Sequence, residues 1–183
     1  MIGKEGSGDF LVADRLRVDA TLDAMAARLH ARLGSAVALV GIRRRGVPLA
    51  EELGRRLARV SGSSPEFGEI ELSRYADDLS LLHDRPLAGQ VDLPRGIENG
   101  TVVLVDDVLY TGRTLIRSIE VLLGHGARRV AIAVLCSRGS TEVPIEAEFV
   151  GMRFDLGDRD LIEVHIPPYE PELRVVLRHR PVE

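Results

Sequence analysis

The chain has 183 residues, 45% of them hydrophobic and 28% charged, which is ordinary for one well-buried α/β domain. Its formal net charge of -4 gives no global sign of a nucleic-acid or membrane partner, so any such binding has to come from a local patch. The single cysteine, Cys136, excludes an intrachain disulfide and a cysteine-built metal site, and a buried position in a reducing compartment is expected. No stretch has the apolar core of a signal peptide or a membrane span, which predicts a cytoplasmic protein with a frayed start over residues 1–12.

The first half of the chain predicts a helix, a strand and a second helix. The first helix is expected to begin with Thr21 as its cap and to end at Gly34, because the apolar residues between them recur at helical spacing: Leu22, Met25, Leu29 and Leu33. The stretch VALVGI predicts a buried strand, and after Arg-Arg-Arg-Gly a helix is expected to open at Pro48. Its apolar face consists of Leu49, Leu53, Leu57 and Val60.

A long irregular segment interrupts this alternation. Residues 69–72 predict a short strand, whereas residues 73–99 have no steady period and contain many polar and turn residues, as in a functional mobile loop or a disordered segment. Residues 101–105 then predict a strand, followed by a loop and by a helix with apolar residues on one face: Leu115, Ile116, Ile119, Leu122 and Leu123. The stretch RVAIAVLC predicts another buried strand.

Strands separated by helices imply an α/β fold. We expect a mostly parallel central sheet with helices on both faces and a working edge at the carboxyl ends of its strands. The C-terminal stretches AEFVG, LIEVHI and LRVVLRH alternate more strongly, and they either finish this sheet or form a small hood over it. We find no internal repeat and no second domain, so residues 1–183 are expected to form one domain.

Two adjacent acidic residues, Asp106 and Asp107, follow an apolar strand at that working edge. Neighbouring ionised carboxylates repel one another and lose hydration there, so sugar hydroxyls or a hydrated Mg²⁺ would have to compensate them. The segment from Thr111 to Thr114 adds hydroxyls, exposed N–H groups and a helix N-terminus, which favour a phosphate. Together these elements indicate a phosphorylated sugar as the ligand. The alternative is an acidic surface turn that leads into an ordinary helix cap.

The stretch VLVDDVLYTGRT closely resembles the phosphoribosyl-pyrophosphate (PRPP) signature of type I phosphoribosyltransferases, in the form found in the pyrimidine-operon attenuator family. The resemblance extends to ALVGIRRRGVPLA, which is similar to the pyrophosphate loop of the family, to YADDLS, which is similar to its mobile loop, and to AVLCSRGSTEVPIEAEFVG. It covers residues 22–151, and the last thirty or so residues match less well.

The resemblance implies a role for each matching residue. Asp106 and Asp107 would hold the ribose hydroxyls, Thr111 to Thr114 the 5′-phosphate, and the loop after the first strand the pyrophosphate. The residues so assigned to PRPP are Arg43, Arg44, Arg45, Gly46, Asp106, Asp107, Thr111, Gly112, Arg113 and Thr114. Those implied in catalysis are Asp106, Asp107, Arg74, Asp77 and Asp78, and those on the base side are Tyr110, Arg138, Val150 and Gly151. Mg²⁺ would be bound through PRPP, with no ligand taken directly from the protein.

The resemblance also implies the choice of base. Relatives that salvage purines carry an Asp immediately before the Thr-Gly, where this chain has Tyr110, and this difference favours uracil over hypoxanthine or guanine. The implied partners are PRPP, uracil and the pyrimidine nucleotides UMP and UTP, together with leader mRNA and further copies of the chain in a dimer or a larger homo-oligomer.

Three departures from the family pattern bear on activity. The family has Arg before the Asp-Asp of the mobile loop, where this chain has Ala76, and Arg74 could substitute. Ser140 and Thr141 replace a His-Arg pair, so RNA is expected to bind weakly, and residues 152–155 replace a segment that contains Lys-Asn. Two hypotheses therefore stay open: a uracil phosphoribosyltransferase that also regulates pyrimidine genes, and a PRPP- or nucleotide-binding regulator without transferase activity.

Overall fold

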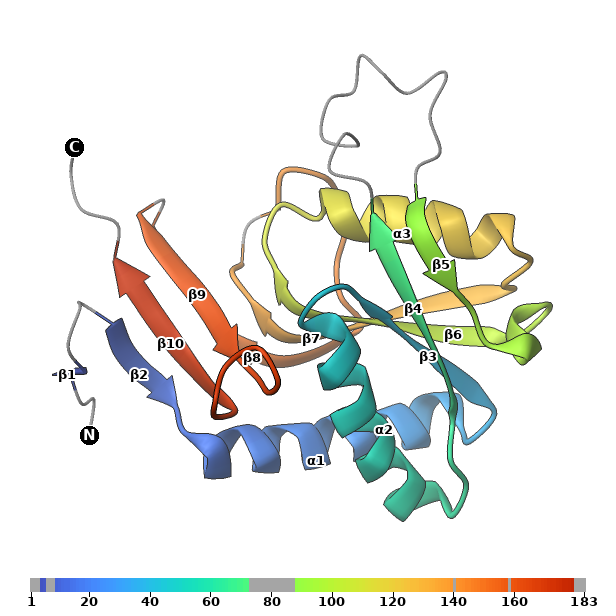
Figure 1. Ribbon diagram of the computed structural model, residues 1–183, viewed down its shortest axis with the longest axis horizontal. Helices are drawn as coiled ribbons and strands as arrows, with labels where there is room; N and C mark the ends of the chain where they lie inside the picture. The colour runs from blue at the N-terminus through green and yellow to red at the C-terminus, as the bar shows by residue number, and fades with distance from the viewer. Residues whose placement is uncertain (1–3, 6–8, 73–87, 140, 158, 180–183) are drawn as a thin grey trace.

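The computed structural model describes residues 4–5, 9–72, 88–139, 141–157 and 159–179. Its central sheet has six strands in the order β5-β4-β3-β6-β7-β8 (Figure 1). Adjacent strands in this sheet are parallel, except that β5 is antiparallel to β4. A second, antiparallel sheet has the order β1-β2-β10-β9. The expected α/β architecture with a separate hood is confirmed.

The bounds of the elements are β1 Lys4–Glu5, β2 Asp9–Ala13, α1 Arg15–Leu33, β3 Val37–Ile42, α2 Gly46–Ser61, β4 Glu66–Leu72, β5 Ala88–Asp92, a 3-10 helix Arg95–Ile97, β6 Thr101–Leu109, α3 Arg113–Gly124, β7 Arg129–Ser137, β8 Phe149–Arg153, β9 Asp160–His165 and β10 Arg174–His179. None of the helices within the described ranges combines the length and the hydropathy needed to cross a bilayer.

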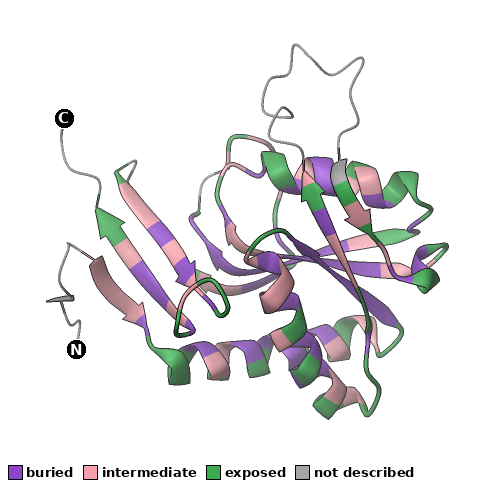
Figure 2. Cartoon of the chain, in the orientation of Figure 1, coloured by how far each residue is buried: buried purple, intermediate pink, exposed green. Residues whose placement is uncertain are grey.

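Helices cover the central sheet on both of its faces. Successive residues of β3 point to opposite faces: Leu39 joins a core with the apolar sides of α1 and α2, and Val40 joins a second core with α3. β6 divides its residues in the same way, with Val103 in the first core and Leu104 in the second. This is why the two strands read as continuous apolar runs, and why they are the buried centre of the molecule in Figure 2.

Several predicted boundaries were wrong. Helix α1 begins six residues before Thr21, because Asp14 caps it by accepting a hydrogen bond from the Arg17 N–H at 2.9 Å. Thr21 lies inside the helix and its hydroxyl donates to the Arg17 carbonyl at 2.8 Å. The predicted end of α1 at Gly34 is confirmed, with φ at 76°.

The segment expected to be irregular contains regular structure in its second part. β5 pairs with β4 from Ala88 to Asp92, and the 3-10 helix follows it. β5 escaped prediction because AGQVD is short and mostly polar, and an edge strand of this kind forms only because β4 offers it hydrogen bonds. Likewise, residues 9–12 of the expected frayed start belong to β2, which pairs with β10.

The C-terminal strands do both of the things that the sequence left open. β8 finishes the central sheet beside β7, whereas β9 and β10 form the hood with β2. Buried hood residues such as Val164 and Val175 belong to the same core cluster as Leu22 of α1. The hood is therefore fixed to the central sheet through α1.

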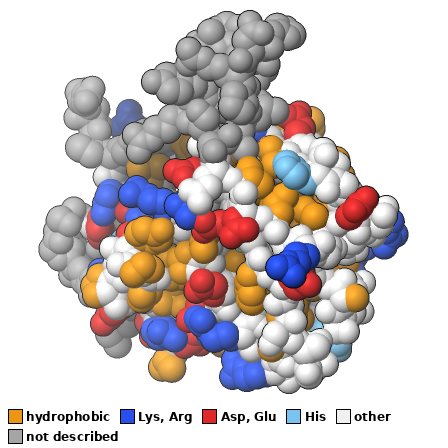
Figure 3. Space-filling view, turned by 45° about the vertical axis from the view of Figure 1, so that its right-hand side comes forward, with side chains coloured by type: hydrophobic (Ala, Val, Ile, Leu, Met, Phe, Trp, Pro, Cys, Tyr) orange, Lys and Arg blue, Asp and Glu red, His pale blue; other side chains and the backbone are white. Residues whose placement is uncertain are grey.

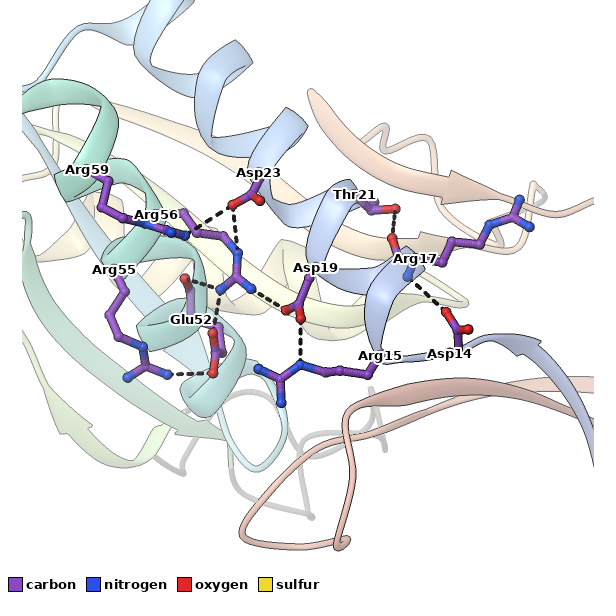
Figure 4. A network of polar contacts seen from close by, with 10 residues as sticks. All are labelled: Asp14, Arg15, Arg17, Asp19, Thr21, Asp23, Glu52, Arg55, Arg56 and Arg59. Atoms are coloured by element: carbon purple, nitrogen blue, oxygen red, sulfur yellow. Dashed lines mark hydrogen bonds and ion pairs between the residues drawn. The ribbon is translucent and has the colours of Figure 1, made fainter.

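A buried arginine joins the two helices on one face of the sheet (Figure 4). The Arg56 side chain of α2 is 7% exposed and forms ion pairs with Asp19 and Asp23 of α1 and with Glu52 of α2. The Asp23 contact, Nε to Oδ1, is 3.1 Å long. Since an isolated buried guanidinium would be costly, these three carboxylates are what allows Arg56 to lie between the helices.

Candidate active site at the carboxyl edge of the parallel sheet

The carboxyl ends of β3 and β6 lie next to each other, and β6 continues beyond its neighbour. The pairing of β3 with β6 ends at Gly41 opposite Val105, whereas β7 accompanies β6 as far as Leu109. The predicted end of this strand at Val105 was therefore wrong by four residues. Beyond Val105, β6 pairs with a strand on one side only among the described strands.

The loop that follows β3 approaches this part of β6 closely. A Cβ placed on Gly46 would lie 2.5 Å from the carbonyl oxygen of Val105, so only glycine allows α2 to start against β6. Helix α2 begins at Gly46, two residues before the predicted Pro48. The peptide bond between Arg43 and Arg44 is cis.

Asp106 and Asp107 are partly exposed residues on this continuation of β6. The Asp106 carboxylate accepts a hydrogen bond from the Asp107 N–H at 2.9 Å, and the Asp107 carboxylate accepts one from the Val108 N–H at 3.0 Å. Burial of the carboxyl group, followed by repulsion from Asp107, holds the pKa of Asp106 well above its usual range. Burial also raises the pKa of Asp107, although the bond with Asp106 and the charge of Arg45 oppose this effect.

The pKa values of both carboxyl groups are raised chiefly by burial, and Arg45 offsets this effect only in part and only at Asp107. Hydroxyl donors or a cation would stabilise their ionised forms. Among the described residues, no group of three or more His, Cys, Asp or Glu side chains is arranged to hold a metal ion. The pair suits a ligand that presents vicinal hydroxyls and a cation of its own.

The loop from Thr111 to Thr114 leads directly into α3. Gly112 has φ at 83° and its Cβ would lie 2.4 Å from Ile145 Cγ2, so the loop fits closely against the segment after β7. The Glu142 N–H donates to the Thr111 carbonyl at 3.0 Å, and the Arg113 guanidinium lies 3.0 Å from the Glu142 carboxylate. The Arg113 N–H donates to the Thr111 hydroxyl at 3.4 Å, whereas the N-cap residue Gly112 has no side chain to cap the first turn of α3. A helix start of this kind is suited to binding an anion.

The three successive arginines are brought to this edge, and each has a partner. Arg43 pairs with Glu69 of β4 and lies 3.7 Å from Glu71. The Arg44 guanidinium carbon lies 5.8 Å from the centre of the Tyr169 ring. Arg45 pairs with Glu170 in the loop between β9 and β10. The arginines stand out in the sequence but their partners do not, because the hood loop carries no motif and its position depends on tertiary packing.

On the base side, Tyr110 and Arg138 lie together. The Arg138 guanidinium carbon is 4.6 Å from the centre of the Tyr110 ring, and its Nη2 donates to the Gly157 carbonyl at 2.6 Å. Arg138 is 8% exposed, and its Nε has no hydrogen-bond partner among the described residues. Val150 and Gly151 of β8 are enclosed by other parts of the fold: Val150 is 7% exposed, and a Cβ on Gly151 would lie 2.6 Å from the carbonyl of Leu135.

Three of the predicted catalytic residues, Arg74, Asp77 and Asp78, lie outside the described residues. The remaining expected site residues share one edge of the sheet, except that Val150 and Gly151 are packed into its last strand.

Comparison with known proteins agrees with this geometry. Residues 14–171 match the model of the phosphoribosyl transferase domain family. Among solved structures, a hypoxanthine phosphoribosyltransferase of Trypanosoma cruzi has a TM-score of 0.75 at 16% identity, covering 98% of this chain and 95% of its own. Another, from Staphylococcus aureus, has a TM-score of 0.71 at 20% identity, covering 93% and 92%. At these identities the two structures support the fold alone.

The fold, the arrangement of the site and the match to the family model place the chain among the phosphoribosyltransferases. Sequence relatives narrow the class. A bifunctional protein PyrR of Elusimicrobium minutum is 32% identical over 91% of this chain and 95% of the relative, and that of Pelotomaculum thermopropionicum is 39% identical over 76% and 77%. The same protein of Thermus thermophilus is 38% identical over 79% of this chain and 80% of the relative. The chain belongs to the PyrR family.

Proposed function

We propose that the protein transfers the phosphoribosyl group of PRPP to uracil, forming UMP and pyrophosphate, and that it regulates pyrimidine genes in response to pyrimidine nucleotides. The observation that carries this proposal is the Asp106–Asp107 pair on the part of β6 that extends beyond β3, followed after four residues by the N-terminus of α3, where Gly112 provides no side-chain cap. A carboxylate pair and an anion site at one strand end match the hydroxyls and the 5′-phosphate of a ribose phosphate.

PRPP would lie along the carboxyl edge of the central sheet, and each of its chemical groups would face a different segment of the protein. Asp106 and Asp107 would accept hydrogen bonds from the ribose hydroxyls, and Thr111 to Thr114 would hold the 5′-phosphate at the start of α3. The loop of Arg43 to Gly46 would face the pyrophosphate. Mg²⁺ fits this arrangement because the charge of Arg45 opposes the raised pKa of Asp107 only in part and that of Asp106 not at all, and the ion would arrive bound to PRPP and neutralise pyrophosphate oxygens.

In the reaction, a uracil nitrogen forms a bond to the anomeric carbon while the bond from that carbon to the pyrophosphate oxygen breaks. The bonding electrons leave with pyrophosphate and the nitrogen loses its proton. Positive charge builds on the ribose ring beside Asp106 and Asp107, and negative charge builds beside the arginine loop. The protein therefore acts mainly by positioning and by electrostatic stabilisation.

Uracil is the preferred base in this proposal because Tyr110 replaces the acidic residue that the purine-salvage pattern has. The unpartnered Nε of Arg138 supports a polar contact near Tyr110. The test is a transfer assay with radiolabelled uracil, PRPP and Mg²⁺, with hypoxanthine and guanine as competing bases. Formation of UMP without purine nucleotides is expected, and faster turnover of a purine would contradict the base assignment.

The second candidate is a nucleotide-binding regulator without transferase activity. Two departures from the family pattern favour it: the segment after FVG lacks Lys-Asn, and Ala76 stands where the mobile loop of the family has Arg. The same assay separates the two candidates, since binding of PRPP without turnover of any base would support the regulator.

Weak binding of leader mRNA is also part of the proposal. Ser140 lies outside the described residues, and the nearby arginines are engaged: Arg129 pairs with Glu148 at 2.9 Å, and Arg128 Nε donates to the Asn99 carbonyl at 3.3 Å. On the face shown in Figure 3, basic side chains lie among acidic ones and form no broad basic surface within the described part. Filter binding across a salt series tests this, and nanomolar affinity with a steep salt slope would contradict it.

A further inference from the structure

The loop between β9 and β10 reaches from the hood to the start of α2, as can be followed in Figure 1. Glu170 in this loop forms an ion pair with Arg45, in which Arg45 Nη2 donates to Glu170 Oε1 and Arg45 Nε lies 3.4 Å from Oε2. Oε2 also accepts a hydrogen bond from the Ile166 N–H at 2.9 Å. The Glu170 carboxylate therefore bonds both to Arg45 in the loop after β3 and to the backbone of Ile166 within the hood loop.

The contact is accessible to a ligand. The side chain of Arg45 is 34% exposed and that of Glu170 is 18% exposed. Arg45 also interacts electrostatically with Asp107, so the same guanidinium is shared between the hood carboxylate and one carboxyl group of the site. The bond from Glu170 raises the pKa of Arg45, and the bonds from Arg45 and Ile166 outweigh burial to lower the pKa of Glu170, so both groups are charged at neutral pH.

A carboxylate and a phosphate oxygen compete for the same guanidinium donors. If the loop after β3 faces pyrophosphate, as the proposed function requires, Glu170 holds the donors that the ligand needs. It also places a negative charge beside the arginine to which an anion carrying several charges would have to bind.

We propose that Glu170 is an internal competitor of the pyrophosphate group, which displaces it from Arg45 and thereby releases the hood loop. Glu170 then sets the affinity for pyrophosphate and couples its binding to the β9–β10 loop. This inference rests on the proposed function and adds to it a residue that lies outside every motif of the sequence.

The alternative role for Glu170 is to position Arg45 for the ligand, and the two roles predict opposite effects. Glu170→Gln keeps the size of the side chain and one acceptor oxygen but removes the charge. If Glu170 competes, the variant binds pyrophosphate more tightly. If Glu170 positions Arg45, the variant binds equally well or less well.

The experiment is calorimetric titration of the intact protein with Mg-pyrophosphate, comparing wild type with Glu170→Gln and Glu172→Gln. Glu172 is an exposed residue of the same loop, so its variant carries the same change of charge as a control. We expect Glu170→Gln to bind about threefold to tenfold more tightly than wild type, and Glu172→Gln to differ from wild type by less than about twofold. Equal or weaker binding by Glu170→Gln, or an equal gain in both variants, would overturn the inference while the proposed function stands.

A second measurement uses the wild-type protein alone. Displacement of Glu170 removes the acceptor of the Ile166 N–H, so hydrogen exchange of this amide, followed by NMR, should accelerate when Mg-pyrophosphate is added. Unchanged or slower exchange with bound pyrophosphate would contradict release of the loop. A wild-type protein that binds neither pyrophosphate nor PRPP would overturn the proposed function, and the inference with it.

Discussion

At the scale of single residues, Asp106 and Asp107 show a conflict between the stability of the chain and the function proposed for them. Their raised pKa values mean that the folded chain without ligand binds protons more tightly than the unfolded chain does. The stability of the ligand-free protein therefore decreases as pH rises from the unfolded value near 3.8 through the raised folded values. A ligand that supplies hydroxyls and a cation would remove this cost.

Asp106→Asn should therefore stabilise the ligand-free protein at neutral pH, by about 0.5 to 2 kcal/mol, because the amide has no charge to desolvate. It should also weaken PRPP-Mg²⁺ binding strongly, since each charge-assisted hydrogen bond is worth about 1.5 to 3 kcal/mol. Urea unfolding and calorimetry measure the two effects, and the exposed Asp92→Asn is the control. Unchanged PRPP affinity would remove the basis of the proposed site.

Gly46 provides a second prediction at this scale. Gly46→Ala places a methyl group against the fixed carbonyl of Val105, so α2 has to move away from β6, at a cost of about 1 to 3 kcal/mol. The displaced loop should also bind PRPP less well. A Cβ on Gly124, the last residue of α3, meets no described atom within 4 Å outside its own helix, so Gly124→Ala should leave stability unchanged or raise it slightly, because alanine favours a helix. Equal stability of the two variants would show that the space between Gly46 and the carbonyl of Val105 is large enough for a methyl group.

At the scale of elements, the contact between α1 and α2 depends on Arg56. Arg56→Met leaves three carboxylates without their shared cation, and we expect the free energy of unfolding to fall by about 2 kcal/mol, less than for a fully buried pair because the carboxylates are partly exposed. Arg59, which is 69% exposed and 3.2 Å from Asp23, supplies the control Arg59→Met, with an effect below about 0.5 kcal/mol. Chemical denaturation measures both, and a loss as small as that of the control would contradict a structural role for the network.

The same network predicts a dependence on pH. Burial acts to raise the pKa of Glu52, but the bonds from Arg56 and Arg55 outweigh it, so the folded pKa lies below the usual 4.5. A lowered folded pKa gives stability that is present above pH 4.5 and is lost as pH falls through the folded value. Unfolding curves from pH 6 to pH 3 should show this loss in wild type and a smaller one in Glu52→Gln. Parallel curves for the two proteins would exclude Glu52 as its source.

At the scale of the whole molecule, the two sheets share one core. Val164 and Val175 of the hood pack in the same cluster as Leu22 of α1 and Leu135 of β7. The hood is consequently expected to unfold together with the central sheet, although it belongs to a separate sheet by hydrogen bonding.

Val164→Ala tests this coupling, because Val164 is fully buried in the hood. We expect a loss of about 2 kcal/mol in a single transition that is the same by circular dichroism and by tyrosine absorbance. Val60→Ala, at a position 48% exposed on α2, should change stability little. Two separate transitions in Val164→Ala would show that the hood unfolds independently.

The sequence by itself determined the elements whose signals are local. The apolar runs of β3, β6 and β7 predicted the parallel sheet because they are buried on both faces, and the Asp-Asp pair before Thr-Gly-Arg-Thr predicted the site because its chemistry lies within one short segment. The end of α1 at Gly34 followed from the backbone freedom of glycine.

Tertiary structure alone decided what depends on distant partners. β5 exists because β4 pairs with it, and β6 extends to Leu109 because β7 continues beside it. The pairing of β10 with β2 in the hood and the pairing of Arg45 with Glu170 join residues more than a hundred positions apart. Periodicity and motif carry no information on such contacts, because they arise from packing between surfaces that each segment presents only after it has folded.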